Sequence, residues 1–326
     1  MAEITLVEAV NRALAHELQR DPTVVVLGED VGVNGGVFRA TAGLQERFGA
    51  ARVMDTPLAE SLIAGMAVGM AVEGLRPVAE IQFSGFIYST VDHMINHASR
   101  MRNRTRGRFA CPMVLRSPSG GGIRAPEHHS ESNEAVFVNA PGLRVVVPSS
   151  PARAYGLLLA AIRDPDPVIF LEPTRLYRLI KEEVADTGEA LPLDVCFTLR
   201  EGKDVTLVSW GASVHETLSA ARELSAEGIE AQVIDVATLK PLDMETILQS
   251  VGRTGRCVVV HEAARTGGFG AEVAANLAER GLLSLLAPVV RVTGYDTVMP
   301  LARLEQHYLP STRRIVAAVR KVMEYA

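Results

Sequence analysis

The sequence predicts an α/β protein with two domains, each built on a parallel sheet. Short apolar runs alternate with amphipathic helical segments along almost the whole chain, a pattern typical of a parallel sheet covered by helices. The length of 326 residues exceeds what a single hydrophobic core usually holds. The charged segment 181–203, which carries Gly188, Pro192 and Gly202, lacks a sustained period and indicates a connection. The expected division is 1–185, first domain; 186–203, linker; 204–326, second domain.

The first domain is expected to begin with a helix. Thr5 and Glu8 form a capping box at its start, and Asp21-Pro22 ends it. The apolar run 24–27 predicts a strand buried on both faces. The same reasoning gives the later elements in order: a helix at 57–74 with Thr56 as N-cap, a strand at 77–83, a helix at 88–105, strands at 112–116 and 144–147, a helix at 151–163 and a strand at 168–171.

The second domain repeats the alternation. Ser213 and Asp243 are expected to cap two of its helices, because both precede helical periods. Its expected elements are strands at 205–208, 231–236, 257–260 and 289–292, and helices at 213–227, from 243 onward, at 269–280 and at 311–324.

Composition excludes several classes of protein. A net charge of -5 and a pI near 6.0 argue against a nucleic-acid or anionic-membrane binder, and the five arginines within 100–108 are expected to be solvated at a helix end. The three cysteines form no C-x-x-C pair, so we expect neither disulfides nor a zinc site, and a cytoplasmic location. No signal peptide or membrane-spanning run is expected.

Polar residues follow three of the predicted strands. Glu29 lies just after the first strand, where open parallel sheets bind ligands, although a Gly-Glu-Asp sequence also serves simply as a turn. Glu60 falls in the first turn of a helix, where a carboxylate is favoured by the helix dipole alone. Glu80 and Gln82 alternate with apolar residues and are expected to face the same side.

A glycine-rich loop at 119–122 leads to His128 and His129. No Lys-Ser or Lys-Thr at a helix start follows it, so a P-loop is excluded. The two histidines lie beside carboxylates, but their spacing fits no common metal motif. Residues alone therefore leave this loop open between a structural and a catalytic role.

Six segments together closely resemble the E1 β subunits of 2-oxo acid dehydrogenase complexes. They occur in the family's order and span essentially the whole chain. They are Gly28-Glu29-Asp30-Val31-Gly32, Gly35-Gly36-Val37-Phe38-Arg39, the run from Arg52 to Glu60, Glu80-Ile81-Gln82-Phe83, Pro141-Gly142-Leu143 and the run from Asp166 to Pro173.

The resemblance implies a transketolase-like pyrimidine-binding domain followed by a transketolase C-terminal-like domain. It also implies an α2β2 tetramer with an E1 α subunit, in which thiamine diphosphate lies across the α/β interface and the α subunit holds the diphosphate and Mg²⁺ through a Gly-Asp-Gly stretch. This chain contains no Gly-Asp-Gly. It is therefore expected to be only half of an active site, and its other expected partner is the lipoyl-bearing E2.

Individual roles follow from the same resemblance. Glu60 matches the glutamate that donates a proton to the aminopyrimidine ring, and Phe86 matches the aromatic residue that packs on that ring. Gln82 and Glu29 match polar residues of the same pocket. His129 matches the histidine that orients substrate and assists acyl transfer, for which a partly protonated imidazole is suitable. His128 has no assigned role.

The resemblance also implies a potassium site. Its ligands are expected to be carbonyls near Met113, Ala161 and Ile162, with Asp164 and Asp166. The loop 120–130 is more similar to pyruvate-type than to branched-chain β subunits, so pyruvate is the favoured substrate. The alternatives are a branched-chain or acetoin dehydrogenase β subunit, the C-terminal half of a split transketolase, and a non-catalytic scaffold that retains the fold.

Overall fold

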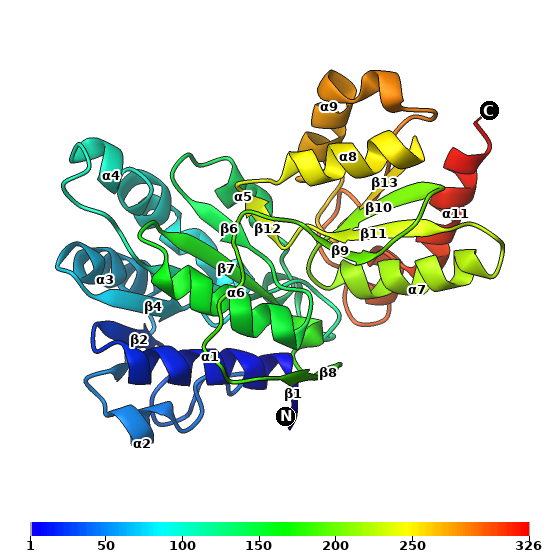
Figure 1. Ribbon diagram of the computed structural model, residues 1–326. Coiled ribbons are helices and arrows are strands. Elements are labelled where there is room, and N and C mark those ends of the chain that lie inside the picture. Colours follow the sequence, from blue (N-terminus) through cyan, green and yellow to red (C-terminus); the bar gives the residue numbers. More distant parts are fainter. Residues whose placement is uncertain (1, 326) are drawn as a thin grey trace.

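The computed structural model describes residues 2–325, which form two sheets placed side by side (Figure 1). The first sheet has seven strands in the order β12-β6-β7-β5-β4-β2-β3. Its strands are β2 (Val24–Gly28), β3 (Val53–Asp55), β4 (Arg76–Glu80), β5 (Val114–Ser119), β6 (Arg144–Val146), β7 (Val168–Pro173) and β12 (Thr238–Lys240). Strands that precede β5 in the chain lie on one side of it, and strands that follow it lie on the other. Because β2, β4 and β5 are parallel neighbours, their carboxyl ends lie at the same edge of the sheet.

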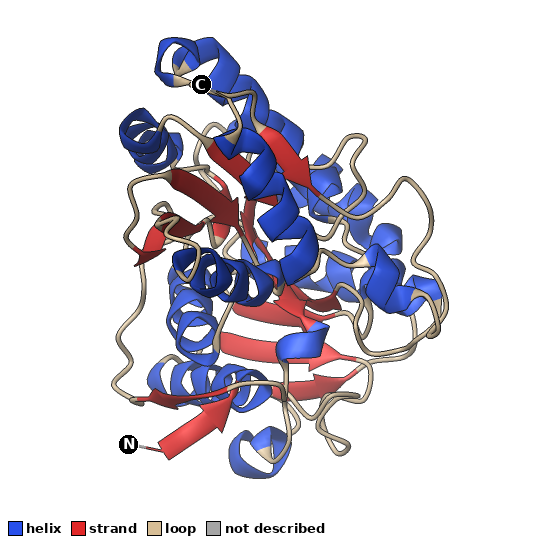
Figure 2. Ribbon diagram, turned by 90° about the vertical axis from the view of Figure 1, so that its right-hand side faces the viewer, coloured by secondary structure: helices blue, strands red, loops and turns tan. Residues whose placement is uncertain are grey.

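Helices cover both faces of this sheet, as the predicted alternation requires (Figure 2). On one face α1 (Leu6–Arg20) and α6 (Pro151–Arg163) lie side by side (Figure 1) and bury the same cluster of apolar side chains. The other helical segments of this half are α2 (Leu44–Phe48), α3 (Glu60–Val72), η1 (Ser84–Thr90), η2 (Asp92–Ala98), α4 (Met101–Arg104), η3 (Glu127–His129), α5 (Glu134–Val138) and η4 (Thr174–Leu176).

Two helix starts in this half differ in whether the N-cap predicted from the sequence forms. The capping box at α1 is confirmed, because the Thr5 and Glu8 side chains each accept from the other's backbone N–H. The predicted Thr56 cap is wrong: α3 begins at Glu60, and the Thr56 hydroxyl is buried without a hydrogen-bond partner. Residues 56–59 therefore approach the helix in a non-helical conformation, and Glu60 opens it.

The predicted helix at 88–105 is wrong in kind. The chain forms instead a 3-10 helix (η1), a π-helix (η2) and a short α-helix (α4) in succession. Tertiary packing explains the break, because Gly85 in η1 lies against the backbone of His128 and Gly142 lies against the backbone of Ser99. Such close approaches determine the local path of the chain and override the helical periodicity of its sequence.

The second sheet has five strands in the order β14-β13-β10-β11-β9. They are β9 (Phe197–Arg200), β10 (Val205–Ser209), β11 (Ala231–Asp235), β13 (Cys257–Val260) and β14 (Val290–Val292). The helical segments are α7 (Ser213–Ser225), α8 (Met244–Thr254), α9 (Gly270–Arg280), η5 (Leu282–Ser284), α10 (Glu305–Tyr308) and α11 (Thr312–Met323). The Asp243 cap of α8 is confirmed, whereas Ser213 is not a cap and its buried hydroxyl has no partner.

Neither sheet is wholly parallel. β12 joins β6 antiparallel at one edge of the first sheet, and β9 joins β11 antiparallel at one edge of the second. The segment 181–203, predicted without regular structure, contains β8 (Lys181–Val184) and β9, and β8 pairs with β1 (Ala2–Thr5). Since β12 comes from the later half of the chain, the first sheet is completed by residues beyond that segment.

The hydrophobic core is continuous between the sheets. One cluster of buried side chains contains Leu115 and Ile169 of the first sheet together with Val208, Ile234 and Val259 of the second. Within residues 2–325, no helix has both the length and the apolar character that a membrane crossing demands.

Candidate functional site

The carboxyl edge of the first sheet brings four of the predicted site residues together. Glu29 follows β2, Glu60 opens α3, and Gln82 and Phe86 follow β4. The Gln82 side-chain amide donates to the Glu29 carbonyl at 3.4 Å. Burial raises the pKa of Glu29, and the charges of Asp30 and Glu60 raise it further. Glu29 and Glu60 therefore lie near enough for the charge of one to act on the other.

His129 joins this group from a distant part of the sequence. Its ring lies 4.0 Å from that of Phe83 and 5.5 Å from that of Phe86, both edge-on. The Nδ1 atom of His129 is buried and has no hydrogen-bond partner. Burial, with the adjacent His128, lowers the pKa of His129 although Glu127 opposes the shift. The imidazole is therefore less protonated near neutral pH than the partly protonated state expected from the sequence.

Gly85 allows this approach. A Cβ at Gly85 would lie 2.1 Å from the His128 carbonyl oxygen, so any side chain there would push the histidine segment away. The Ser84 hydroxyl donates to the Glu131 carbonyl at 2.9 Å, and Asn133 donates to the Ser84 carbonyl at 2.7 Å. Two hydrogen bonds of Ser84, the residue before Gly85, thus fix the histidine loop against η1.

The same loop is held by the second half of the chain. The Glu262 carboxylate accepts from the backbone of Gly121, and the Glu305 carboxylate accepts from the backbone of Gly122 at 2.8 Å and of Arg124 at 3.2 Å. Arg175, which is partly exposed, lies 3.8 Å from Glu262. Both halves of the molecule therefore position the glycine-rich loop and the histidines that follow it.

A buried ion cluster, missed in the sequence, lies directly beneath this edge. Arg116 on β5 donates to Glu80 on β4 and makes two hydrogen bonds of 2.7 Å to Glu172 on β7. Tyr177 donates to Glu172 at 2.6 Å, and burial raises the pKa of Tyr177. Because β4 ends at Glu80, Gln82 does not continue its alternation. The available signal was a charged residue in the buried part of each of these three strands.

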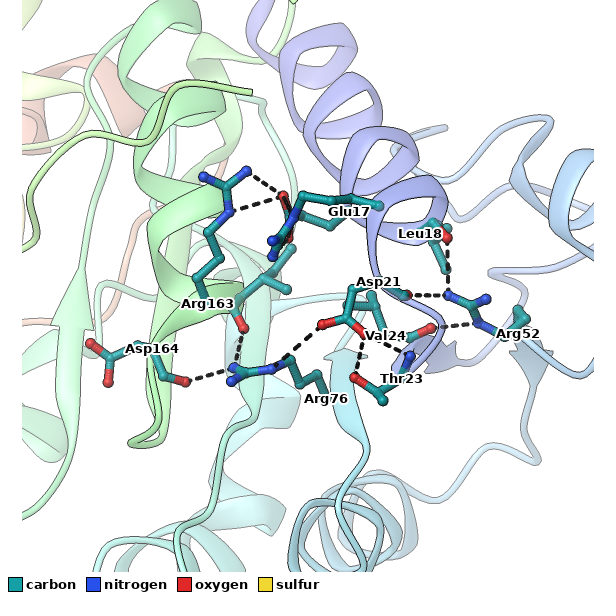
Figure 3. A network of polar contacts seen from close by, with 11 residues as sticks. Glu17, Leu18, Asp21, Thr23, Val24, Arg52, Arg76, Arg163 and Asp164 are labelled. Atoms are coloured by element: carbon teal, nitrogen blue, oxygen red, sulfur yellow. Dashed lines mark hydrogen bonds and ion pairs between the residues drawn. The ribbon is translucent and has the colours of Figure 1, made fainter. Parts of the chain in front are cut away.

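Of the predicted potassium ligands, Asp164 lies just after α6 beside Arg76 (Figure 3). Arg76 donates to the carbonyls of Ile162 at 2.8 Å and of Asp164 at 3.1 Å, and it lies 3.8 Å from Asp21. The Asp164 carboxylate pairs with Arg144, and that of Asp166 with Arg102. The Met113 carbonyl accepts from Val168 at 2.9 Å. These oxygen donors suit a hard cation, but arginines already share several of them.

At the carboxyl edge the residues fit a flat heteroaromatic ligand. The carboxyl groups of Glu29 and Glu60 can bond its polar edge, and Phe86, which packs against His129, can cover its face. In contrast, the sequence offers no Gly-Asp-Gly for a diphosphate. The arrangement can move a proton to or from a ring and orient a small substrate.

Comparisons with known proteins agree with this picture. The family model described as "Transketolase, pyrimidine binding domain" matches residues 2–180, and "Transketolase, C-terminal domain" matches residues 196–315. The chain is 51% identical to the pyruvate dehydrogenase E1 component subunit beta of Acholeplasma laidlawii, covering 99% of this chain and 98% of that protein. It is 49% identical to the corresponding subunit of Bacillus subtilis (strain 168), with both chains covered completely.

A solved structure is similar over the same extent. It is described as a split gene transketolase, inactive beta4 tetramer, and it matches with a TM-score of 0.82 and 28% identity over 99% of both chains. Between the two alternatives of a split transketolase and an E1 β subunit, the higher identity over full length favours the second.

Proposed function

The chain belongs to the family of pyruvate dehydrogenase E1 component β subunits, and we propose that Glu29, Glu60, Gln82, Phe86 and His129 are the residues with which it acts. In this family the subunit takes part in the thiamine-diphosphate-dependent decarboxylation of a 2-oxo acid. Pyruvate is the substrate that the names of the relatives support. The observation that carries the proposal is that Gln82 bonds the Glu29 backbone and Phe86 packs against His129 at the same edge of the sheet, with Glu60 near enough for its charge to act on Glu29.

These residues fit the pyrimidine half of thiamine diphosphate. When bound, the cofactor supplies a carbon nucleophile for the 2-oxo group. Glu60, in the first turn of α3, donates a proton to the ring nitrogen, while Glu29 and Gln82 line the polar edge and Phe86 covers the ring. A rigid helix start holds the Glu60 carboxyl in one place for that transfer.

His129 serves the substrate side of the site. Its lowered pKa keeps the imidazole mostly neutral near pH 7, so its second ring nitrogen, Nε2, is able to accept or donate one hydrogen bond according to its tautomer. We assign to it the orientation of the 2-oxo acid and assistance in transferring the acyl group to the lipoyl arm of E2. His128 receives no role.

The complete enzyme requires an E1 α subunit in an α2β2 tetramer, which binds the diphosphate and Mg²⁺. The absence of a Gly-Asp-Gly sequence supports this division of labour. A cytoplasmic location belongs to the same proposal and is supported by the unpaired thiols of Cys111, Cys196 and Cys257.

One experiment tests the assignment of Glu60. The chain is co-expressed with its α subunit, and the rates of pyruvate decarboxylation, 2-oxoisovalerate decarboxylation and acetoin cleavage are compared. We expect pyruvate to be turned over fastest, and Glu60→Gln to lower kcat by about 100- to 10,000-fold without changing assembly. Glu73→Gln, at the exposed opposite end of α3, is the matched control. A fully active Glu60→Gln enzyme, or an active chain without the α subunit, would contradict the proposal.

A potassium ion at the end of α6 is the second part of the proposal. The ligands would be carbonyls of Met113, Ala161 and Ile162 with Asp164 and Asp166, using lone pairs that the arginines leave free. KCl should then raise the melting temperature of the assembled enzyme more than NaCl of equal concentration. Equal effects of the two salts would remove potassium from the site.

A further inference from the structure

The first turn of the π-helix η2 contains a cluster that has no part in the proposed reaction. Asp92, His93 and His97 each present one potential ligand atom, and these atoms lie within 4.8 Å of one another. We propose that these three side chains bind a divalent transition-metal ion of the zinc class, with water completing the coordination. The site is separate from both the carboxyl edge and the predicted potassium ligands.

The π-helical backbone is what brings the ligands together. In an α-helix with about 3.6 residues per turn, residues five apart point roughly 140° away from each other. In a π-helix, residues five apart lie about one turn apart and face the same side. Accordingly, Oδ2 of Asp92 lies 3.8 Å from Nε2 of His97. The ring of His93, four residues before His97, lies 5.8 Å from the ring of His97.

Neighbouring groups orient these ligands. The Asn96 amide donates to Oδ1 of Asp92 at 2.6 Å, which leaves Oδ2 toward His97. The Ser61 hydroxyl lies 3.1 Å from Nε2 of His93. The same ring packs over Gly65 of α3, where a Cβ would come within 3.1 Å of it. Metal sites in proteins use such outer contacts to fix histidine rings.

The donor set selects the kind of ion. Two imidazoles and one carboxylate with an open position match the three-ligand zinc sites, whereas Mg²⁺ and Ca²⁺ prefer oxygen alone. Donors at about 2.1 Å from zinc in a tetrahedral site lie roughly 3.4 Å apart. Small side-chain rotations would bring the distances between the three donor atoms to that value, because Asp92 and His97 are exposed.

The position of the site gives it a structural consequence. His93 contacts Ser61, the residue next to Glu60, and Gly65 one turn further along α3. An ion held on η2 would therefore fix the segment that packs against the start of α3. We infer that metal binding stiffens this contact without touching the reacting groups.

The test uses the full chain in metal-free buffer and measures Zn²⁺ binding by equilibrium dialysis, with Co²⁺ absorption as a report of coordination geometry. We expect one equivalent of metal per chain and a tetrahedral-type Co²⁺ spectrum. His93→Ala and His97→Ala should each weaken binding by at least about 10-fold. His215→Ala, an exposed histidine of α7, and His128→Ala, whose ring lies 3.7 Å from Glu127, are the controls.

Circular dichroism and thermal melting in chelator establish that the variants remain folded. Absence of stoichiometric binding by the unaltered chain overturns the proposal. So does binding that persists in both His93→Ala and His97→Ala, or binding that is lost to the same degree in His128→Ala or His215→Ala.

Discussion

Arg116 lies on β5 with its guanidinium between two carboxylates of neighbouring strands, Glu80 and Glu172. All three side chains are almost completely buried. A buried charge is tolerated only when it is paired and hydrogen-bonded, and here Tyr177 completes the set. The cluster lies directly below the residues proposed to bind the cofactor, so it fixes the ends of the strands from which they extend.

Removal of the arginine should therefore be costly. Arg116→Met leaves Glu80 and Glu172 buried without a cation, and we expect the free energy of unfolding to fall by about 3–5 kcal/mol. Urea denaturation measures the change. Arg313→Met, at an exposed position of α11, is the matched control and should change stability by about 0.5 kcal/mol or less. A near-neutral Arg116→Met would show that the cluster contributes little.

Gly85 is a second single residue that shapes the site, because it has no side chain. Gly85→Ala places a methyl group 2.1 Å from the His128 carbonyl, so His129 must move away from Phe83 and Phe86. We expect kcat of the assembled enzyme to fall at least about 10-fold, since small misplacements of a positioned group slow catalysis strongly. Gly252→Ala in α8, where nothing lies within 4 Å, should leave kcat unchanged. An unaltered rate in Gly85→Ala would separate His129 from the reaction.

At the scale of elements, the loop before α6 and the end of β11 are joined by one buried hydrogen bond. The Ser149 hydroxyl donates to Oδ2 of Asp235, and the Ala237 N–H donates to Oδ1 at 3.1 Å. Burial nevertheless raises the pKa of Asp235 to about 6. Burial of the charged carboxylate is therefore unfavourable, although both hydrogen bonds favour the ionised form.

The sign of the resulting pH dependence follows from this shift. The folded protein holds the Asp235 proton more tightly than the unfolded chain, whose carboxyl has the ordinary pKa of 3.8. Its contribution to stability is complete below pH 3.8 and is lost as the pH rises through about 6. From pH 4 to pH 7 the unfolding free energy of Asp235→Asn should rise by up to about 3 kcal/mol relative to that of the unaltered protein. Asp194→Asn, at an exposed residue, should show no such trend.

On the scale of the whole molecule, the two halves share one hydrophobic core and one functional loop. The cluster that includes Leu115 continues to Val259 of the second sheet. The carboxylates of Glu262 and Glu305, both from the second half, hold the backbone of Gly121, Gly122 and Arg124. The position of His129 therefore depends on residues more than a hundred positions away.

Loss of one of these carboxylates should loosen the loop. Glu305→Ala removes the acceptor of the Gly122 and Arg124 N–H groups, and we expect faster amide hydrogen exchange across residues 120–129. Mass spectrometry of the exchanged protein measures this effect. Glu279→Ala, at an exposed position of α9, is the control. If exchange in the loop is unchanged, the Glu305 carboxylate does not hold the glycine-rich loop.

The sequence by itself determined the order and type of most elements. Strands such as 24–27 and the helix at 151–163 were predictable because burial on both faces and caps leave strong local signals. Membership of the family was also legible from six segments of the chain. The rule that parallel strands align their carboxyl ends placed Glu29 after its strand, whereas Glu60, Gln82 and Phe86 were assigned to the site by the resemblance to the family.

Only the tertiary structure decided the rest. The break of 84–104 into three helical types, the placement of His129 beside Phe83, and the pairing of Arg116 with two distant carboxylates all arise from contacts between residues far apart in the chain. Local periodicity carries no information about such contacts, because their energy comes from packing and desolvation against another segment. For the same reason the π-turn that joins Asp92 to His97 is visible only in the folded molecule.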